Sequence, residues 1–274
     1  MPAASVDGVT RGMGRESRVG RESRDIDPVL FLRPVPGPPA DVAQLVERDL
    51  PKVDVASSNL VIRSMFTGFP DAALDFYDDL ELDNTKSFWE AHKHVYDSAV
   101  REPMLALTAA LADEFGTAKV FRPYRDVRFA KDKTPYKNHQ GAIVQVGAAT
   151  GYYVQVGSPG VRVSGGYYHA DGPDLARIRT AIDAEHSGEE LERIVGRLKK
   201  KGFEVRGDQL KTSPRGYPAD HPRIELLRYK SMSMTKGYGF ENLDTPDLLD
   251  RVRKDWRALR PLVEWVRERV DVLG

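Results

Sequence analysis

Apolar residues recur at three- and four-residue spacing after residue 65, the pattern of amphipathic helices. A first helix is predicted around Ala73–Leu80, and a second one, N-capped by Asn84, is predicted to reach Tyr96. A third helix is expected from Pro103 to Gly116, because proline is tolerated in a first helical turn. The segment therefore opens with a layer of helices.

The period then changes to that of β-strands. The run "GAIVQVGAATGYYVQVGSPGVRVSGG" consists of short β-rich segments broken by tight-turn residues, which predicts an antiparallel meander. Alternation in "YYVQVG" and "VRVSGG" indicates one buried and one exposed face.

Helices return in the C-terminal part. Ser187 and Glu190 are read as the capping box of one helix, and "FEVRGDQLKTS" is read as a short hairpin. "PRIELLRYKSMSM" is read as a helix followed by a strand. A long last helix is expected after Thr245, with an apolar stripe formed by Leu248, Val252, Trp256, Leu259, Val263 and Val266. Because helices and strands come in blocks, the predicted fold class is α+β, with an antiparallel β meander packed against N-terminal and C-terminal helices.

Residues 1–64 differ from the rest in composition. They contain the repeat "GRESRVGRESRD" and the spacer "RPVPGPPA", which predict a disordered extension. The stretch "DVAQLVERDLPKVDVASSNLVIRS" also resembles the conceptual translation of a transfer-RNA gene, with the D-arm at 42–48 and the T-arm at 57–60. We therefore expect a mis-assigned start, with the natural protein beginning at Met65 and 65–274 forming a single α+β domain.

Composition narrows the function classes. The 274 residues include 41 basic and 41 acidic ones, which argues against a globally basic nucleic-acid surface. Cysteine is absent, so disulfides, thiolate metal sites and a cysteine nucleophile are excluded. The sequence has neither a secretory h-region nor an apolar run of about twenty residues, and the expected location is cytoplasmic.

One segment, "RPYRDVRFAKDKTPYK" at 122–137, concentrates charge and aromatic rings. Its cations are Arg122, Arg125, Arg128, Lys131, Lys133 and Lys137. Its acids are Asp126 and Asp132, and its aromatic residues are Tyr124, Phe129 and Tyr136. If residues 125–133 are extended, Asp126, Arg128 and Asp132 share one face as an ion-paired row, while the other face combines cations with Phe129.

This segment, which we call the basic–aromatic motif, resembles the Arg-Asp-x-Arg-Phe signature of a bacterial family, domain-of-unknown-function family 2461. The segments "FTGFP", "FYDDLELDNTKSFWEAHKHVY" and "LLRYKSM" resemble that family's flanking regions. The resemblance covers 65–274 and none of 1–64. It implies no activity, cofactor or ligand.

Three interpretations of the motif remain open. In the first, its charges form an internal ion-pair network that ties helices to the sheet, with Asp126 and Asp132 as structural acceptors, in a structural or partner-binding domain. In the second, a small phosphorylated or carboxylated ligand is bound by Arg122, Arg125, Arg128, Lys131, Lys133, Tyr136 and Lys137, near Lys86, Trp89, Arg179 or Lys230. In the third, Asp126 or Asp132 is a catalytic base. Binding of nucleic acid along a stripe of cations is a further alternative.

Other candidate sites are weaker. His92 and His94 diverge on a helix, and His139 and His169 lack carboxylates at metal-ligand spacing, so no metal site is predicted. The glycine turns "GVRVSGG" and "GYGFEN" lack the Lys-Ser/Thr of a phosphate loop, and no cofactor is predicted. Whether the protein is an enzyme, and its oligomeric state, stay open.

Overall fold

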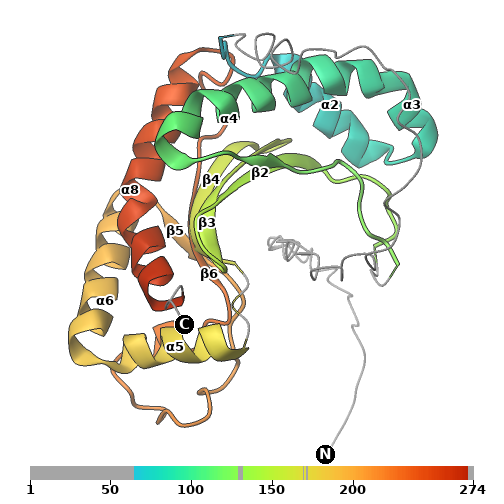
Figure 1. Ribbon diagram of the computed structural model, residues 1–274. Coiled ribbons are helices and arrows are strands. Elements are labelled where there is room, and N and C mark those ends of the chain that lie inside the picture. The colour runs from blue at the N-terminus through green and yellow to red at the C-terminus, as the bar shows by residue number, and fades with distance from the viewer. Residues whose placement is uncertain (1–64, 129–131, 169, 171, 271–274) are drawn as a thin grey trace, which may run out of the picture. The chain divides into compact units, whose positions relative to one another are not determined.

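Helices and one antiparallel sheet make up the part of the chain that the computed structural model describes, namely residues 65–128, 132–168, 170 and 172–270 (Figure 1). These residues lie within a single compact unit. The predictions for residues 1–64, and those for Phe129, Lys131 and His169, fall outside the described residues. Among the described helices, none combines the length and the apolar character needed to cross a membrane.

The sheet has six strands in the order β1-β2-β3-β4-β6-β5, and every neighbouring pair is antiparallel. Its strands are β1 (Lys119–Val120), β2 (His139–Gln145), β3 (Thr150–Gly157), β4 (Gly160–Tyr167), β5 (Glu204–Arg206) and β6 (Met232–Gly237). The predicted meander is confirmed as β2, β3 and β4. The expected α+β class is confirmed as well.

The two faces of the meander differ less in burial than the alternation of apolar and polar residues predicted. Val154 pairs with Val163, and both are fully buried in the core. On the opposite face Gln155 and Arg162 are half-buried, as expected, but Tyr153 and Ser164 are buried. The prediction of an exposed second face was therefore wrong for part of this sheet.

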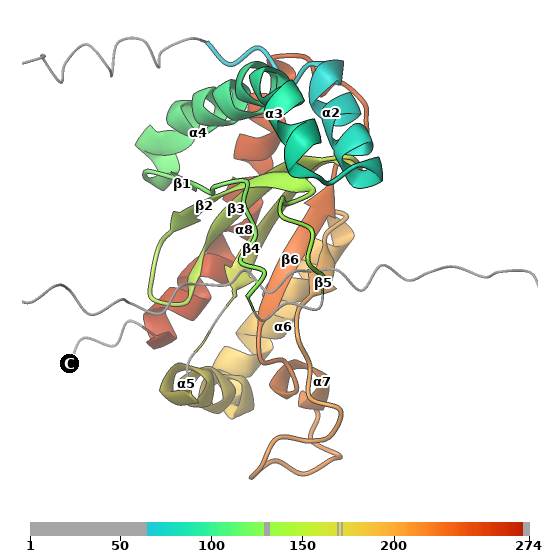
Figure 2. The same cartoon turned by 90° about the vertical axis from the view of Figure 1, so that its right-hand side faces the viewer.

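The N-terminal helices form a layer over one end of the sheet (Figure 2). They are α2 (Asp71–Leu82), α3 (Lys86–Val95), the π-helical turn η1 (Tyr96–Arg101) and α4 (Glu102–Phe115). The second and third predicted helices are thus one continuous helix interrupted by a π-turn. Its N-cap is Thr85, whose Oγ1 accepts the N–H of Phe88 at 3.3 Å, so the expected Asn84 cap was wrong.

The C-terminal helices are α5 (Gly172–Asp183), α6 (Glu185–Lys200), α7 (Ile224–Leu227) and α8 (Asp247–Val270). The stripe predicted for the last helix is confirmed, because all six of its residues are buried. Helix α8 packs on β3 and β4, where Trp256 Nε1 donates to the carbonyl of Tyr153 at 3.3 Å. A Cβ on Gly165 would lie 3.2 Å from Leu259, which shows how closely this helix approaches β4.

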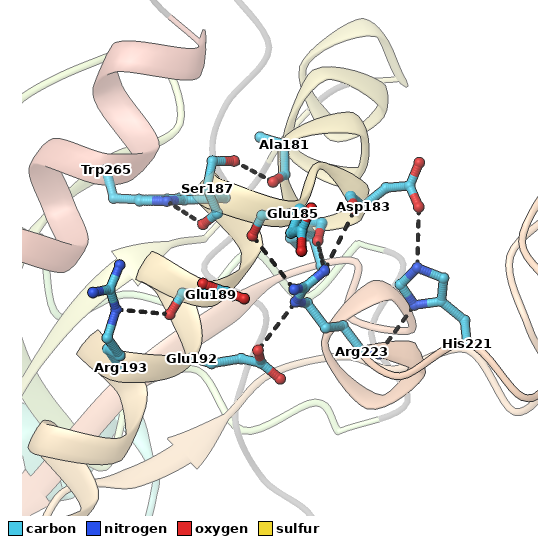
Figure 3. Close-up of polar contacts among 11 residues, drawn as sticks. Ala181, Asp183, Glu185, Ser187, Glu189, Glu192, Arg193, His221, Arg223 and Trp265 are labelled. Carbon is cyan, nitrogen blue, oxygen red and sulfur yellow. Dashed lines mark hydrogen bonds and ion pairs between the residues drawn. The ribbon is translucent and has the colours of Figure 1, made fainter.

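Arg223 joins α5, α6 and the segment before α7 (Figure 3). Its Nε donates to the Glu192 carboxylate at 3.0 Å, and its other nitrogens donate to carbonyls between 182 and 185 at 3.4–3.5 Å. Two of these carbonyls, those of Ile182 and Asp183, are at the C-terminal end of α5, where helix carbonyls lack a partner within the helix. The capping box expected for α6 is not formed: the helix begins at Glu185, and the hydroxyl of Ser187 donates to the carbonyl of Ala181.

Strand β5 does not form the predicted hairpin with the residues that follow it. It pairs with β6, in the register Val205 to Met234, while Gln209 forms an isolated bridge with Tyr229. The later segment from Arg223 onwards was correctly read as a helix followed by a strand, and these are α7 and β6.

Candidate functional site

The basic–aromatic motif folds back on itself between β1 and β2. The N–H of Arg125 donates to the carbonyl of Pro135 at 2.9 Å, and the N–H of Lys137 donates to that of Pro123 at 2.8 Å. Tyr124 and Tyr136 face each other in an antiparallel bridge. The motif is therefore a loop closed by a short ladder, rather than one extended strand.

Asn84 fastens this loop to the helical layer. Its amide nitrogen donates to the carbonyl of Tyr136 at 3.0 Å, and its amide oxygen accepts the N–H of the same residue at 3.0 Å. The Asn84 amide thus makes the same two hydrogen bonds that a neighbouring strand would make, and it satisfies both the N–H and the carbonyl of Tyr136. The short polar residue that resembled a helix cap in the sequence fixes the position of the loop instead.

Aromatic rings fill the contact between the loop and α3. Tyr136 is buried and stacks on Trp89, with ring centroids 4.4 Å apart and an interplanar angle of 9°. The ring of Tyr96 also contacts Trp89, with centroids 4.8 Å apart and an interplanar angle of 50°. Tyr124 is 5.9 Å from Trp89 and 5.5 Å from Tyr136, yet 47% of its surface stays exposed. Tyr136, which was predicted as a ligand contact, is thus a buried member of this aromatic cluster.

The acids of the loop pair with its own arginines. Arg128 makes a bidentate pair with Asp126, at 2.9 and 2.5 Å, although the Arg128 side chain is 74% exposed. Hydrogen bonds from this arginine lower the pKa of Asp126 to about 2. Arg125 donates to the Asp132 carboxylate and to Thr134 Oγ1. Both pairs are internal to the loop and do not bridge the helices and the sheet.

The lysines of the loop are also engaged. Lys133 Nζ donates to the carbonyl of Val127 at 2.8 Å. Lys137 Nζ lies 5.3 Å from the centre of the Phe121 ring, within cation–π range. The remaining cation that the sequence analysis assigned here, Lys131, lies outside the described residues. Among the described motif cations, the Arg122 side chain is exposed and makes no hydrogen bond or ion pair with the described residues.

Arg122 lines a cavity of about 690 Å³ that opens between the loop, β1 and the helical layer. Its walls are formed by Trp89, Lys93, Tyr96, Asp97, Arg101, Leu105, Ala118, Val120, Phe121, Arg122, Pro123 and Tyr124. Three cations and one carboxylate are present, and the carboxylate is already paired, because Lys93 Nζ contacts Asp97. The cavity is therefore electropositive.

The π-turn η1 builds one wall of this cavity. Hydrogen bonds from residue i+5 to residue i place side chains five positions apart above one another, and such turns are frequent at functional sites. Tyr96 and Arg101, which are five apart and point in different directions in a regular α-helix, accordingly line the same cavity. Within the described residues, neither the Arg101 nor the Arg122 side chain makes a hydrogen bond or an ion pair.

Tyr96 is held rigidly at this wall. Its hydroxyl donates to Gln140 Oε1 at 2.5 Å, and Gln140 Nε2 donates to the carbonyls of Phe121 and Gly141 at 2.8 and 2.9 Å. Burial raises the pKa of the Tyr96 phenol to about 12, against the opposing charge of Arg101. The phenol is therefore neutral at physiological pH, and the cavity combines fixed polar groups with cations rather than with a free base.

Several residues that define the cavity were not identified from the sequence. Lys93, Asp97 and Arg101 were not among the candidate residues, because the π-turn that brings them to the cavity has no clear sequence signal. Arg179 and Lys230, expected beside the motif, lie at the far end of the fold. There Arg179 Nε donates to the carbonyl of Leu227 at 3.0 Å, and Lys230 faces Asp208 at 3.9 Å.

The histidines are accounted for by packing. His92 stacks on Phe88 with ring centroids 4.1 Å apart, and its Nδ1 lies 2.9 Å from the Phe88 carbonyl oxygen. Burial, together with the charge of Lys137, lowers the pKa of His139 to about 4. Within the described part of the chain, no group of three or more His, Cys, Asp or Glu side chains is arranged to bind a metal.

Comparison with known proteins places most of this region in one family. Residues 72–265 match the family model described as "Conserved hypothetical protein (DUF2461)". The matched range contains the loop and all residues that line the cavity. No curated protein and no solved structure matches the chain.

Proposed function

Because the chain belongs to the DUF2461 family of conserved hypothetical proteins, whose description assigns no activity, we propose its function from the geometry: the cavity beside the basic–aromatic motif binds a small phosphorylated or carboxylated ligand. Arg101 and Arg122 supply the principal contacts, with Lys93 nearby. The neutral hydroxyl of Tyr96 is held by Gln140 and limits the depth of the site.

The observation that carries this proposal is that two arginine side chains lining the cavity make no hydrogen bond or ion pair with any of the described residues. A guanidinium group offers several N–H donors in a planar fork that matches a carboxylate or phosphate. Two such groups lining one cavity, Arg101 from η1 and Arg122 from the loop after β1, repel each other, and a bound anion offsets that repulsion. By contrast, Arg125 and Arg128 each have a carboxylate within the loop. Of the ligand-binding residues expected from the sequence, we therefore retain Arg122 as a principal contact, and we add Arg101 from the π-turn.

The loop itself fits the structural interpretation better. Its ion pairs, the bidentate contact of Asn84 and the stacking of Tyr136 on Trp89 all fix its shape. We therefore assign Asp126 and Asp132 to loop structure and not to general-base catalysis. A purely structural or partner-binding domain is the alternative, in which the cavity has no small-molecule ligand. The proposal assumes the cytoplasmic location expected from the sequence.

The test is a titration calorimetry and thermal-shift series at low ionic strength, with inorganic phosphate, sugar phosphates and dicarboxylates. Losing one charge-assisted contact weakens binding about tenfold or more, so Arg101→Gln and Arg122→Gln should each raise Kd by at least that factor. Arg215→Gln is the matched control, because Arg215 is exposed and does not line the cavity.

The melting temperature of the ligand-free protein gives a second readout. Removing Arg101 or Arg122 relieves repulsion, so it should leave the melting temperature unchanged or slightly raised. Absence of binding by the whole series, combined with lower stability of both variants, would refute ligand binding and favour the structural alternative.

A further inference from the structure

The cavity is larger and less polar than a site for a simple anion needs to be. Its volume of about 690 Å³ lies within the range of pockets for drug-sized ligands, roughly 300–1,000 Å³. Apolar side chains form much of the wall, namely Leu105, Ala118, Val120, Phe121 and Pro123. A phosphate or carboxylate group bound to the arginines would leave this apolar surface uncovered. The ligand therefore has a second, apolar part.

Tyr124 indicates the shape of that part. It is one of four large apolar side chains that are markedly exposed in the described structure, and it is the only one of the four that lines the cavity. Its ring contacts Trp89 and Tyr136, and the 47% of its surface that stays exposed provides aromatic area beside the cavity.

The ring of Tyr124 is also held in place before any ligand arrives. Its backbone is fixed by the bridge to Tyr136, which Asn84 in turn binds through both backbone groups. Ordering a side chain on binding costs free energy, and a ring that is already ordered avoids most of that cost. A rigid tyrosine beside a pair of arginines provides a stacking surface next to an anion site, the combination that recognises a base and its phosphate.

We propose that the ligand is a mononucleotide, with its phosphate on Arg101 and Arg122 and its base stacked on Tyr124. This inference rests on the proposed anion site and specifies its ligand class. Stacking tolerates any base because every base has an aromatic face, so purine and pyrimidine nucleotides are both expected to bind. The ribose would span the wall formed by Val120 and Phe121.

The experiment compares three compounds by titration calorimetry with the full chain: AMP, ribose 5-phosphate, which lacks the base, and adenosine, which lacks the phosphate. AMP should bind about tenfold more tightly than ribose 5-phosphate, as expected for one base–aromatic contact. Tyr124→Leu should abolish this preference and leave the Kd of ribose 5-phosphate unchanged, whereas Tyr124→Phe should retain it. Arg122→Gln should weaken the binding of both phosphates equally.

Each outcome separates this inference from the proposal on which it rests. Equal Kd values for AMP and ribose 5-phosphate, or a preference for AMP that persists in Tyr124→Leu, would overturn the nucleotide assignment and leave the anion site standing. Binding of AMP and adenosine with equal affinity would overturn the anion site itself. If none of the three compounds binds, the nucleotide assignment is wrong, and the anion site is wrong as well if inorganic phosphate and the dicarboxylates also fail to bind. Melting curves of each variant confirm that the loop substitutions leave the protein folded.

Discussion

Two glycines of helix α6 should respond in opposite directions to the same substitution. Replacing glycine by alanine inside a helix usually stabilises a protein by about 1 kcal/mol. At Gly196 a new Cβ would meet no atom within 4 Å, so we expect the full increase of about 1 kcal/mol in the free energy of unfolding. At Gly188 the Cβ would lie 2.2 Å from the Ile182 carbonyl oxygen and 2.7 Å from Arg223 Nε.

The cost at Gly188 follows from what must move. Ordinary contacts between carbon and oxygen are about 3.3 Å or longer, so the end of α5 has to shift by about 1 Å. Overpacking of this kind costs about 1–3 kcal/mol, and displacing Arg223 weakens its hydrogen bonds to the α5 carbonyls. Adding about 1 kcal/mol for those weakened hydrogen bonds and subtracting the helix-propensity gain of about 1 kcal/mol, we expect Gly188→Ala to lower the free energy of unfolding by about 2 kcal/mol.

Thermal and urea unfolding of the two variants provide the assay. For a domain of this size 1 kcal/mol corresponds to about 2–4 °C, so Gly196→Ala should melt about 2–4 °C above the parent and Gly188→Ala about 4–8 °C below it. Unchanged urea m-values would show that both variants unfold from equally compact native states. The reasoning is wrong if Gly188→Ala is stabilised as much as Gly196→Ala, since the α5–α6 junction would then be free to adjust.

Three further predictions concern single side chains. Asp255→Ala should destabilise the fold by about 2 kcal/mol, because Lys236 loses its buried partner at 3.1 Å; the partial exposure of Lys236 limits the loss. In urea unfolding, the double variant with Lys236→Met should recover most of the lost free energy of unfolding. His139, with its pKa lowered from 6.5 to about 4 by burial, is protonated more readily in the unfolded chain, so stability is complete above pH 6.5 and falls by up to about 3 kcal/mol as the pH drops to 4. His139→Gln should flatten this decline in urea unfolding measured across that range, and an unchanged slope would assign it to other groups. Asn84→Ala should speed amide hydrogen exchange at Tyr136, since the N–H loses its acceptor, and unchanged protection would show that the acceptor is dispensable.

The parts of the fold that could be predicted from sequence are those with strong periodicity. Helix α8 repeats apolar residues over many turns, and its buried stripe was assigned residue by residue. The meander was predictable because tight turns separate β-rich runs of similar length, so that neighbouring strands in sequence also pair in space.

The remaining features depend on contacts between distant segments. Asn84 looks like a helix cap locally, but its partner Tyr136 is 52 residues away. Strand β5 has hairpin-like residues after it, yet it pairs with β6, beyond α7. The cavity is harder still to predict. Pro103 is compatible with a new helix and with a continued one, so the π-turn, and the placing of Arg101 and Arg122 around one cavity, follow only from the packed structure.

The order of strands has a consequence for synthesis of the chain. In the finished sheet the edges are β1 and β5, which have only two and three residues, so they offer few unpaired groups to another molecule. Strand β4, with eight residues, is paired on its outer side only by β6. While the ribosome is still translating α5, α6 and α7, the long edge of β4 stays open to strands from neighbouring nascent chains. Protection against aggregation therefore begins when Met232–Gly237 emerges, late in translation.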